Sequence, residues 1–157
     1  MRTHHQPFFN IRQAKPADLP ALTHLLGHLF AQEAEFKPNA ARQREGLKRL
    51  LSPKAPAKVY VAEVRGKVLG MVSLLLTTST ALGKPVAWLE DLVVDPHWRG
   101  QGLGSALLDH ALAQAQVLGL ARVTLLTDAN NRHAQALYRS RSFKASSMRI
   151  LRWVPKP

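Results

Sequence analysis

Cysteine is absent from the 157-residue chain, and this absence excludes several kinds of chemistry at once. A chain without cysteine has no disulfide framework, no thiolate zinc site and no cysteine nucleophile. No apolar run approaches the roughly 18 residues of a membrane-spanning helix, and residues 1–10 show no apolar signal core. We therefore expect a cytoplasmic protein without a membrane partner.

Acidic residues are also scarce. Ten Asp and Glu stand against 22 Lys and Arg, which gives a net charge of +12. This surplus predicts an anionic partner, unless it only reflects a solvated surface. The densest basic clusters, at residues 42–49 and 132–141, are not interleaved with several aromatic residues, as binding to single-stranded nucleic acid would require. We expect no nucleic-acid partner; the alternative requires an affinity that falls steeply with salt.

The length and the apolar content of 46% indicate one globular domain over residues 1–157, with residues 1–7 and 155–157 as disordered tails. Apolar periodicity predicts helices over 19–36, 39–51, 103–118 and 131–141. Alternating patterns and turn residues predict strands over 8–13, 59–64, 68–78, 86–94 and 122–127, with one or two closing strands over 143–154. This order favours a mixed α/β (α+β) fold, in which about four helices flank a central twisted sheet of six or seven strands.

The most informative segment is residues 99–105, Arg-Gly-Gln-Gly-Leu-Gly-Ser, between a predicted strand and a predicted helix. Three glycines at alternate positions let the backbone approach a ligand closely. The first N–H groups of the helix and its dipole then favour an anion, and Arg99 adds a guanidinium suited to phosphate oxygens. Two other phosphate-binding loops do not fit this segment. A dinucleotide-binding fingerprint would come early in the chain, and a P-loop needs Gly-Lys-Ser/Thr, which is absent here. A merely tight turn, the structural alternative, needs only one glycine.

Two motifs resemble the GCN5-related N-acetyltransferase (GNAT) superfamily. Leu89-Glu90-Asp91-Leu92-Val93-Val94-Asp95-Pro96, followed by Arg99-Gly100-Gln101-Gly102-Leu103-Gly104, resembles its acetyl-coenzyme A motif. The later pattern N-x-x-A-x-x-x-Y-x-x-x-x-F is matched by Asn131, Ala134, Tyr138 and Phe143. The family usually has glycine before the phenylalanine, where this chain has Ser142. If that position needs a positive φ, serine costs about 1 kcal/mol there.

The resemblance implies a cofactor, acetyl-coenzyme A, and a role for each matching position. The backbone of Leu92, Val93 and Val94 would bind the pantetheine arm like an extra strand. The pyrophosphate would be held by Arg99, Gly100, Gln101, Gly102, Leu103, Gly104 and Ser105. Asn131 and Ala134 would contact the cofactor, and Tyr138 would lie near the thioester sulfur.

Amine chemistry assigns the catalytic roles. A primary amine with a pKa near 10.4 is almost wholly protonated at neutral pH, so a base must remove a proton, directly or through water. Glu90 is the predicted base, because the Leu-Glu-Asp run resembles that of the diamine acetyltransferases. The alternative is a purely structural role for Glu90, in a salt bridge at the strand edge. Tyr138 would protonate the departing thiolate, unless it is only a core aromatic. Neighbours on a strand face opposite sides, so Asp91 would serve structure or substrate.

We therefore expect an N-acetyltransferase that acts by direct attack in a ternary complex on a small amine or polyamine. Glu33 and Glu35 would attract a cationic amine, and a homodimer is the family-level expectation. A non-catalytic acyl-CoA-binding module and a protein (lysine or N-terminal) acetyltransferase stay open, as do aminoglycoside and amino-acid acceptors. We expect no metal, because His24 and His28, four apart on a predicted helix, have no evident third ligand.

Overall fold

The computed structural model describes residues 8–157, and the chain forms two compact units, Met1–Leu126 and Thr127–Pro157. The first unit contains, in chain order, β1 (Asn10–Gln13), η1 (Pro16–Asp18), α1 (Leu19–Gln32), α2 (Ala40–Leu51), β2 (Ala57–Val64), β3 (Lys67–Ser79), β4 (Lys84–Val94), η2 (Pro96–Trp98), α3 (Leu103–Val117) and β5 (Val123–Leu125). The second unit contains α4 (Arg132–Ser140). Over residues 8–157, no helix has the length and apolarity needed to cross a membrane.

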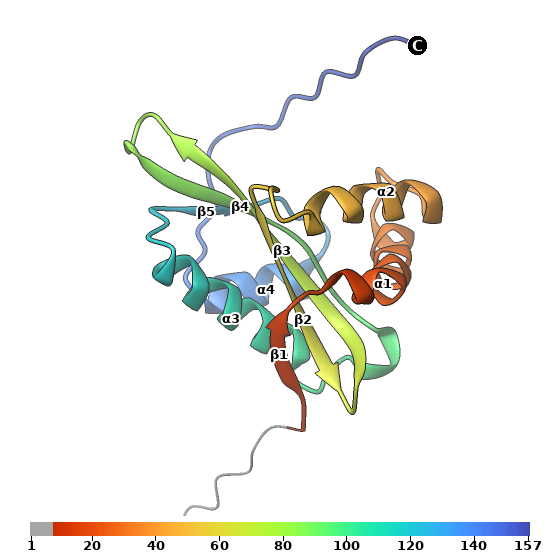
Figure 1. Cartoon of the computed structure of the whole chain (residues 1–157). Helices are drawn as coiled ribbons and strands as arrows, with labels where there is room; N and C mark the ends of the chain where they lie inside the picture. The colour runs from red at the N-terminus through yellow and green to blue at the C-terminus, as the bar shows by residue number, and fades with distance from the viewer. Residues whose placement is uncertain (1–7) are drawn as a thin grey trace, which may run out of the picture. The chain divides into compact units, whose positions relative to one another are not determined.

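The first unit is built on a five-stranded sheet in the order β1-β2-β3-β4-β5 (Figure 1). The pairs from β1 to β4 are antiparallel, whereas β4 and β5 are parallel. Parallel neighbours need a crossover connection, and α3 supplies it. The glycine-rich loop therefore lies where the chain leaves β4 and enters this crossover helix.

Helices cover both faces of the sheet. Successive side chains along a strand point alternately to one helical layer and to the other. Val59 and Val61 of β2 belong to a buried cluster with the apolar residues of α1 and α2. The intervening Tyr60 points the other way and stacks edge-on against His110 of α3, with ring centroids 4.8 Å apart. Figure 1 shows α1 and α2 on one side of the strands and α3 on the other. The helical spacing of the buried Leu22, Leu25 and Leu26 explains why α1 packs here.

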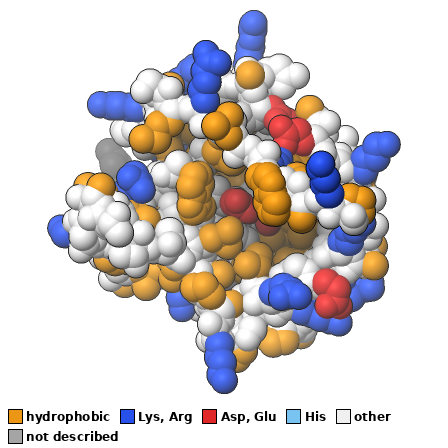
Figure 2. All heavy atoms as spheres, turned by 90° about the horizontal axis from the view of Figure 1, so that it is seen from above, with side chains coloured by type: hydrophobic (Ala, Val, Ile, Leu, Met, Phe, Trp, Pro, Cys, Tyr) orange, Lys and Arg blue, Asp and Glu red, His pale blue; other side chains and the backbone are white. Residues whose placement is uncertain are grey.

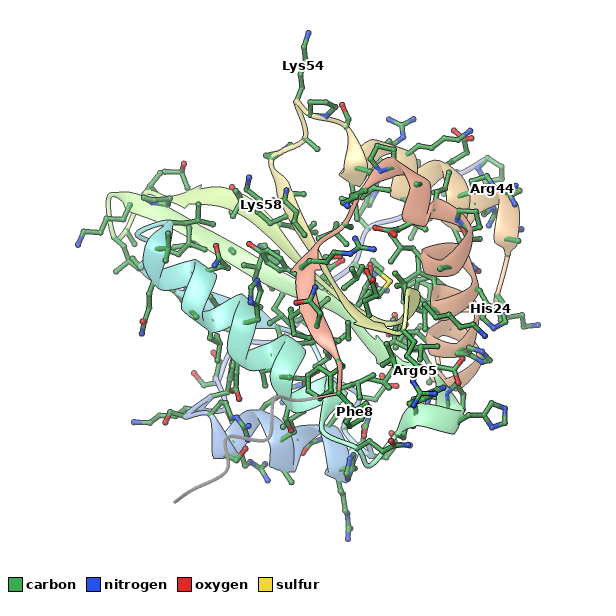
Figure 3. The ribbon with its side chains drawn as sticks, turned by 60° about the horizontal axis from the view of Figure 1, so that its bottom comes forward. Phe8, His24, Arg44, Lys54, Lys58 and Arg65 are labelled. Atoms are coloured by element: carbon green, nitrogen blue, oxygen red, sulfur yellow. The ribbon has the colours of Figure 1, made fainter. Side chains whose placement is uncertain are left out.

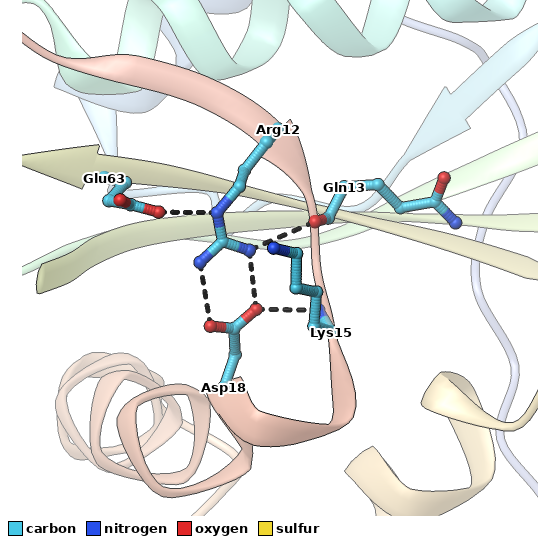
Figure 4. A network of polar contacts seen from close by, with 5 residues as sticks. All are labelled: Arg12, Gln13, Lys15, Asp18 and Glu63. Atoms are coloured by element: carbon cyan, nitrogen blue, oxygen red, sulfur yellow. Dashed lines mark hydrogen bonds and ion pairs between the residues drawn. The ribbon is translucent and has the colours of Figure 1, made fainter. Parts of the chain in front are cut away.

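A partly buried ionic network fixes the start of α1 against the sheet (Figure 4). Arg12 of β1 donates to both carboxylate oxygens of Asp18, at 2.8 and 2.9 Å, and its Nε donates to Glu63 of β2 at 2.5 Å. Asp18 also accepts the backbone N–H of Lys15 at 2.7 Å. The hydrogen bonds from Arg12 hold the pKa of Asp18 below its ordinary value. The network therefore orients α1, which is followed directly by the candidate site residue Glu33.

The structure corrects the predicted strand count. Over residues 8–157, five strands form rather than six or seven, while the four α-helices match the predicted number. Residues 143–154 form no strand among the described residues, because a strand needs a ladder partner and this segment has none. Its large hydrophobic side chains are consequently exposed, namely Met148, Ile150, Leu151, Trp153 and Val154.

The end of α1 differs from its predicted position, and only one of the two predicted tails lies among the described residues. The predicted helix over 19–36 ends at Gln32, because Glu33 adopts extended backbone with φ −76° and ψ 142°. Of the two predicted tails, residues 1–7 lie outside the described residues, and residues 155–157 are exposed and without regular structure. The single domain over 1–157 stays a prediction.

Candidate active site

The glycine-rich loop has the backbone conformation that only glycine adopts easily. Gly100 has φ 74° and Gly102 has φ 90°, and Gly102 is the N-cap of α3. A Cβ added at either position would meet no heavy atom within 4 Å, so the space beside both residues is open. The glycines are therefore required by backbone conformation, not by crowding, and the open space admits a ligand close to the main chain.

The first turn of α3 offers backbone donors toward this space. The first helical hydrogen bond runs from Ala106 N–H to Gly102 C=O at 3.0 Å, so the N–H groups of Leu103, Gly104 and Ser105 precede the helical ladder. Gly102 supplies no capping side chain. Arg99, which is exposed, anchors its Nε on the Val94 carbonyl at 3.3 Å. A pyrophosphate fits this donor set, because it combines several N–H groups, the positive helix end and a guanidinium.

Strand β4 has a bulge immediately before the loop. Ser73 of β3 pairs with Glu90 and Met71 pairs with Val93, so Asp91 and Leu92 together oppose the single residue Val72. Asp91 has φ 55°, the left-handed conformation, which a non-glycine residue adopts only at a cost. Bulges of this kind redirect side chains next to active sites. The period of two along β4 is therefore interrupted at Asp91 and Leu92.

The same strand has an open edge. The β4–β5 pairing covers only Ala87, Trp88 and Leu89, opposite Val123–Leu125. Beyond Leu89, the edge of β4 that faces away from β3 pairs with no strand in the described part of the chain. The segment Leu92–Val94 thus presents main-chain groups to which an extended ligand can bind as an additional strand would.

Two carboxylates of the first unit, Glu90 and Glu33, act on the carboxyl group of Asp91 at the bulge. Burial, followed by the negative charges of Glu90 and Glu33, raises the pKa of Asp91 from 3.8 to about 7. Glu90 is exposed, whereas Asp91 and Glu33 are partly buried. The structure therefore brings together Glu33, Glu90 and Asp91, while Glu35 lies exposed in the segment between α1 and α2.

The raised pKa of Asp91 is the feature that sequence analysis missed. The adjacent acidic pair within an apolar strand was the available signal, since a like charge and burial both disfavour ionisation. A carboxyl group that titrates near neutral pH can accept a proton from a substrate and release it to water.

In the second unit, the residues of the later motif organise α4. The Asn131 side chain caps the helix by accepting the Ala134 N–H at 3.1 Å, which explains the spacing of these two residues. Tyr138 packs edge-on against Phe143, with ring centroids 5.8 Å apart, and burial raises the pKa of its phenol. Tyr138 is consequently protonated at neutral pH.

Ser142 follows α4 with φ 67°, the left-handed conformation that the family's usual glycine would favour. The conditional prediction for this position is confirmed, and the serine carries the strain of about 1 kcal/mol. The turn keeps its shape through two backbone bonds, from Ser142 N–H to Arg139 C=O at 3.0 Å and from Phe143 N–H to Tyr138 C=O at 3.1 Å.

On the face that Figure 2 shows, the positive charge does not form one patch. On the face in Figure 2, Lys and Arg side chains are separated by hydrophobic and uncharged ones. Acidic side chains are few on this face, as the net charge of +12 requires. A dispersed positive field attracts anions in general but does not by itself select a nucleic acid.

The fold and the loop together define a protein that can hold a phosphate-bearing ligand at the N-terminus of α3, and comparison with known proteins gives the family. Residues 21–143 match the Acetyltransferase (GNAT) family. The chain is 33% identical over 138 residues to an uncharacterized N-acetyltransferase, YhfO, of Bacillus subtilis (strain 168), covering 86% of this chain and 89% of that protein. It is 28% identical over 145 residues to the aminoalkylphosphonate N-acetyltransferase of Salmonella typhimurium (strain LT2), covering 92% and 90%.

A solved structure agrees in fold. A possible acetyltransferase from Clostridium difficile 630 superposes with a TM-score of 0.85 at 18% identity, covering 96% of this chain and 99% of that chain. The chain belongs to the GNAT acetyltransferase family and is an N-acetyltransferase. Enzymes of this family generally use acetyl-coenzyme A.

Proposed function

We propose that the protein transfers the acetyl group of acetyl-coenzyme A to a primary amine of a small, cationic acceptor. The observation that carries this proposal is the carboxylate group Glu33, Glu90 and Asp91, which adjoins the open edge of β4. Clustered carboxylates attract an ammonium and raise its local concentration. The relative from Salmonella typhimurium, whose name specifies an aminoalkylphosphonate acceptor, supports a small amine.

The residues proposed to hold the cofactor fall into three groups. The main chain of Leu92, Val93 and Val94 would hold the extended pantetheine arm, and the loop Arg99–Ser105 would hold the pyrophosphate. In the second unit, Asn131, Ala134 and Tyr138 remain proposed contacts. Acetyl-coenzyme A supplies an acetyl thioester, and the protein holds the amine against it, which accounts for much of the acceleration.

The base is proposed to belong to the Glu90–Asp91 pair. Glu90 is the residue assigned from the Leu-Glu-Asp resemblance. Asp91 has the property that a base needs at neutral pH, because its pKa is raised to about 7. Its position at a strained bulge supports the same role. We assign proton removal to the Asp91 carboxylate and attraction of the ammonium to Glu90 and Glu33.

The proposed acid is Tyr138. As the C–S bond breaks, the phenol can hand its proton to the departing thiolate and recover one from solvent. A thiolate whose conjugate acid has a pKa near 8.5 is a weaker base than a phenolate, so this transfer is uphill by itself and is driven by reprotonation of the phenolate from solvent. Burial, which raises the pKa of Tyr138, keeps the phenol protonated throughout the working range.

Replacing Tyr138 by Phe is expected to lower kcat about 100-fold and to leave the KM for acetyl-coenzyme A within about twofold. The reason is that only the hydroxyl proton is removed, while the ring packing against Phe143 is kept. Steady-state kinetics of thiol release measure both constants. Tyr60→Phe is the matched control, a buried tyrosine in contact with His110. If Tyr138→Phe keeps the kcat of the parent protein, Tyr138 has only a packing role.

The proposed function is tested with a panel of acceptors and acetyl-coenzyme A. Polyamines, aminoalkylphosphonates, aminoglycosides, amino acids and lysine peptides are compared by thiol release, and cofactor binding is measured by calorimetry. Release with a small cationic amine is the expected result. Binding without release for any acceptor would identify a non-catalytic module, and release only with peptides would identify a protein acetyltransferase.

Assembly and location are proposed on separate grounds. We propose a homodimer in the cytoplasm, without a nucleic-acid partner. The exposed hydrophobic side chains of residues 148–154 support self-association, because a monomer leaves them in water. Light scattering of the purified protein tests this, and a single monomeric species across micromolar concentrations would contradict it.

A further inference from the structure

Outside the proposed active site, two histidines of α1 come together with an aspartate from a distant part of the chain. His24 and His28 lie one helical turn apart, with their Nε2 atoms 3.1 Å from each other and their ring planes at 85°. The donor atoms of His24, His28 and Asp95 all lie within 4.8 Å of one another. Sequence analysis found the histidine pair but no third ligand, because Asp95 follows β4, far along the chain.

The spacing of the two nitrogens suits a bound metal ion. A metal about 2.0–2.1 Å from each nitrogen places them about 3 Å apart at a right angle and about 3.4 Å apart in a tetrahedron. The observed 3.1 Å lies between these values. A hydrogen bond between the rings also accounts for this distance, but it does not account for the convergence of a carboxylate on the same point.

Asp95 is held in position by the fold. Its backbone N–H donates to Leu69 C=O at 2.8 Å, which fixes it to the beginning of β3. Its Oδ1 accepts the His97 N–H at 2.9 Å. A carboxylate accepts such a bond and still offers lone pairs to a metal. The proposed ligands therefore come from two histidines of α1 and from the turn after β4, which these hydrogen bonds hold in place. Side-chain adjustment alone can bring the three donor atoms onto one metal ion.

The site is accessible from solvent. A cavity of about 410 Å³ is lined by His24 and Asp95, together with Asp18 and Lys67. The carboxylate of Asp18 is engaged by Arg12, so it belongs to the ionic network and not to the ligand set. Figure 3 shows the side chain of His24 on α1, near the turn that follows β4. The cavity gives room for waters to complete the coordination of an ion.

We propose that His24, His28 and Asp95 form a binding site for a divalent transition-metal ion. Two imidazole nitrogens and one carboxylate oxygen favour Zn²⁺, Ni²⁺, Co²⁺ or Cu²⁺ over Mg²⁺ and Ca²⁺, which prefer oxygen ligands. Three protein ligands leave further positions to water. A bound ion links α1 to the segment that leads into the Arg99–Ser105 loop, so it stabilises the folded protein.

The test is calorimetric titration of the untagged protein with Zn²⁺ at pH 7.5, where imidazoles are mostly neutral. His4 and His5 are replaced by Ala in every sample, because this pair near the N-terminus can bind metal on its own. One equivalent of Zn²⁺ is expected to bind, with a rise in Tm. Co²⁺ is expected to give visible absorption bands from nitrogen and oxygen ligation.

Three variants decide the outcome. His28→Gln and Asp95→Asn are each expected to weaken Zn²⁺ binding about tenfold or more, and asparagine keeps the acceptor for the His97 N–H. His133→Gln, an exposed histidine of α4, is the matched control and should bind as the parent does. Circular dichroism without metal checks that each variant folds. Unchanged affinity in Asp95→Asn, or absence of stoichiometric binding in the parent, would overturn the proposal.

Discussion

Gly102→Asp is expected to abolish binding of acetyl-coenzyme A. Gly102 has φ 90° at the N-cap of α3, and a Cβ there would extend into open space beside the first turn of the helix. In the proposed arrangement that space holds the pyrophosphate. A carboxylate would accept the N–H groups that the phosphates need and would repel their charge. Calorimetric titration with acetyl-coenzyme A should show no heat of binding at millimolar cofactor.

Two further variants separate the effect of charge from that of backbone strain. Gly102→Ala adds a Cβ at the same positive φ but no carboxylate, so we expect weakened binding that stays measurable. Gly83→Asp places the same side chain at φ 63° in the β3–β4 turn, where a Cβ also meets nothing within 4 Å. This control matches the strain and the charge at a distant position. It should bind cofactor as the parent does.

A Gly102→Asp protein that folds and keeps its affinity would show that the loop does not hold the phosphates. The comparison with Gly83→Asp makes such a result interpretable, because both variants pay a similar conformational cost of about 1–2 kcal/mol. A loss of binding in both variants would instead indicate unfolding, which thermal melting detects directly.

The parts of the molecule that could be predicted from sequence are those set by local chemistry. The spacing of leucines predicted α1 and α3, and the glycine-rich segment predicted a loop that precedes α3. Asn131 was predicted near the start of α4, where its side chain caps the helix. In each case, nearby residues decide the structure, because helical periodicity and capping act within one or two turns.

The parts that could not be predicted depend on strand register and on distant contacts. The pattern predicted an uninterrupted strand over 86–94, but the bulge of Asp91 and Leu92 opposite Val72 interrupts its period of two. A bulge is set by how β3 and β4 pair, which the sequence of β4 alone does not encode. For the same reason, the pattern of residues 143–154 predicted a strand that has no ladder partner in the described structure. Asp95 meets His24 only through the fold.

Asp91→Asn is expected to lower kcat about 100- to 1,000-fold, because the amide cannot accept the amine proton. In the parent, kcat/KM should fall as the pH drops through about 7, since protonation of Asp91 removes the base. The variant should lose this acid limb. Kinetics with the best amine of the panel, measured from pH 5.5 to 9, check both statements.

The fold of this variant is not expected to suffer. The pKa of Asp91 is raised from 3.8 to about 7, so above the unfolded value the charged form is less stable in the folded protein. A neutral amide removes that penalty, and asparagine tolerates the left-handed backbone better than most residues. Asp91→Asn should therefore melt at the parent's Tm or above it, which separates lost catalysis from unfolding.

Glu90→Gln distinguishes the two candidate bases. The negative charge of Glu90 raises the pKa of Asp91, so its removal should move the acid limb of kcat/KM to lower pH. Activity at pH 8 should then fall by no more than about tenfold, mainly through a higher KM for the cationic amine. If Glu90 itself takes the proton, Glu90→Gln loses activity at every pH and Asp91→Asn keeps it. The direction in which the limb moves thus assigns the proton to one carboxylate.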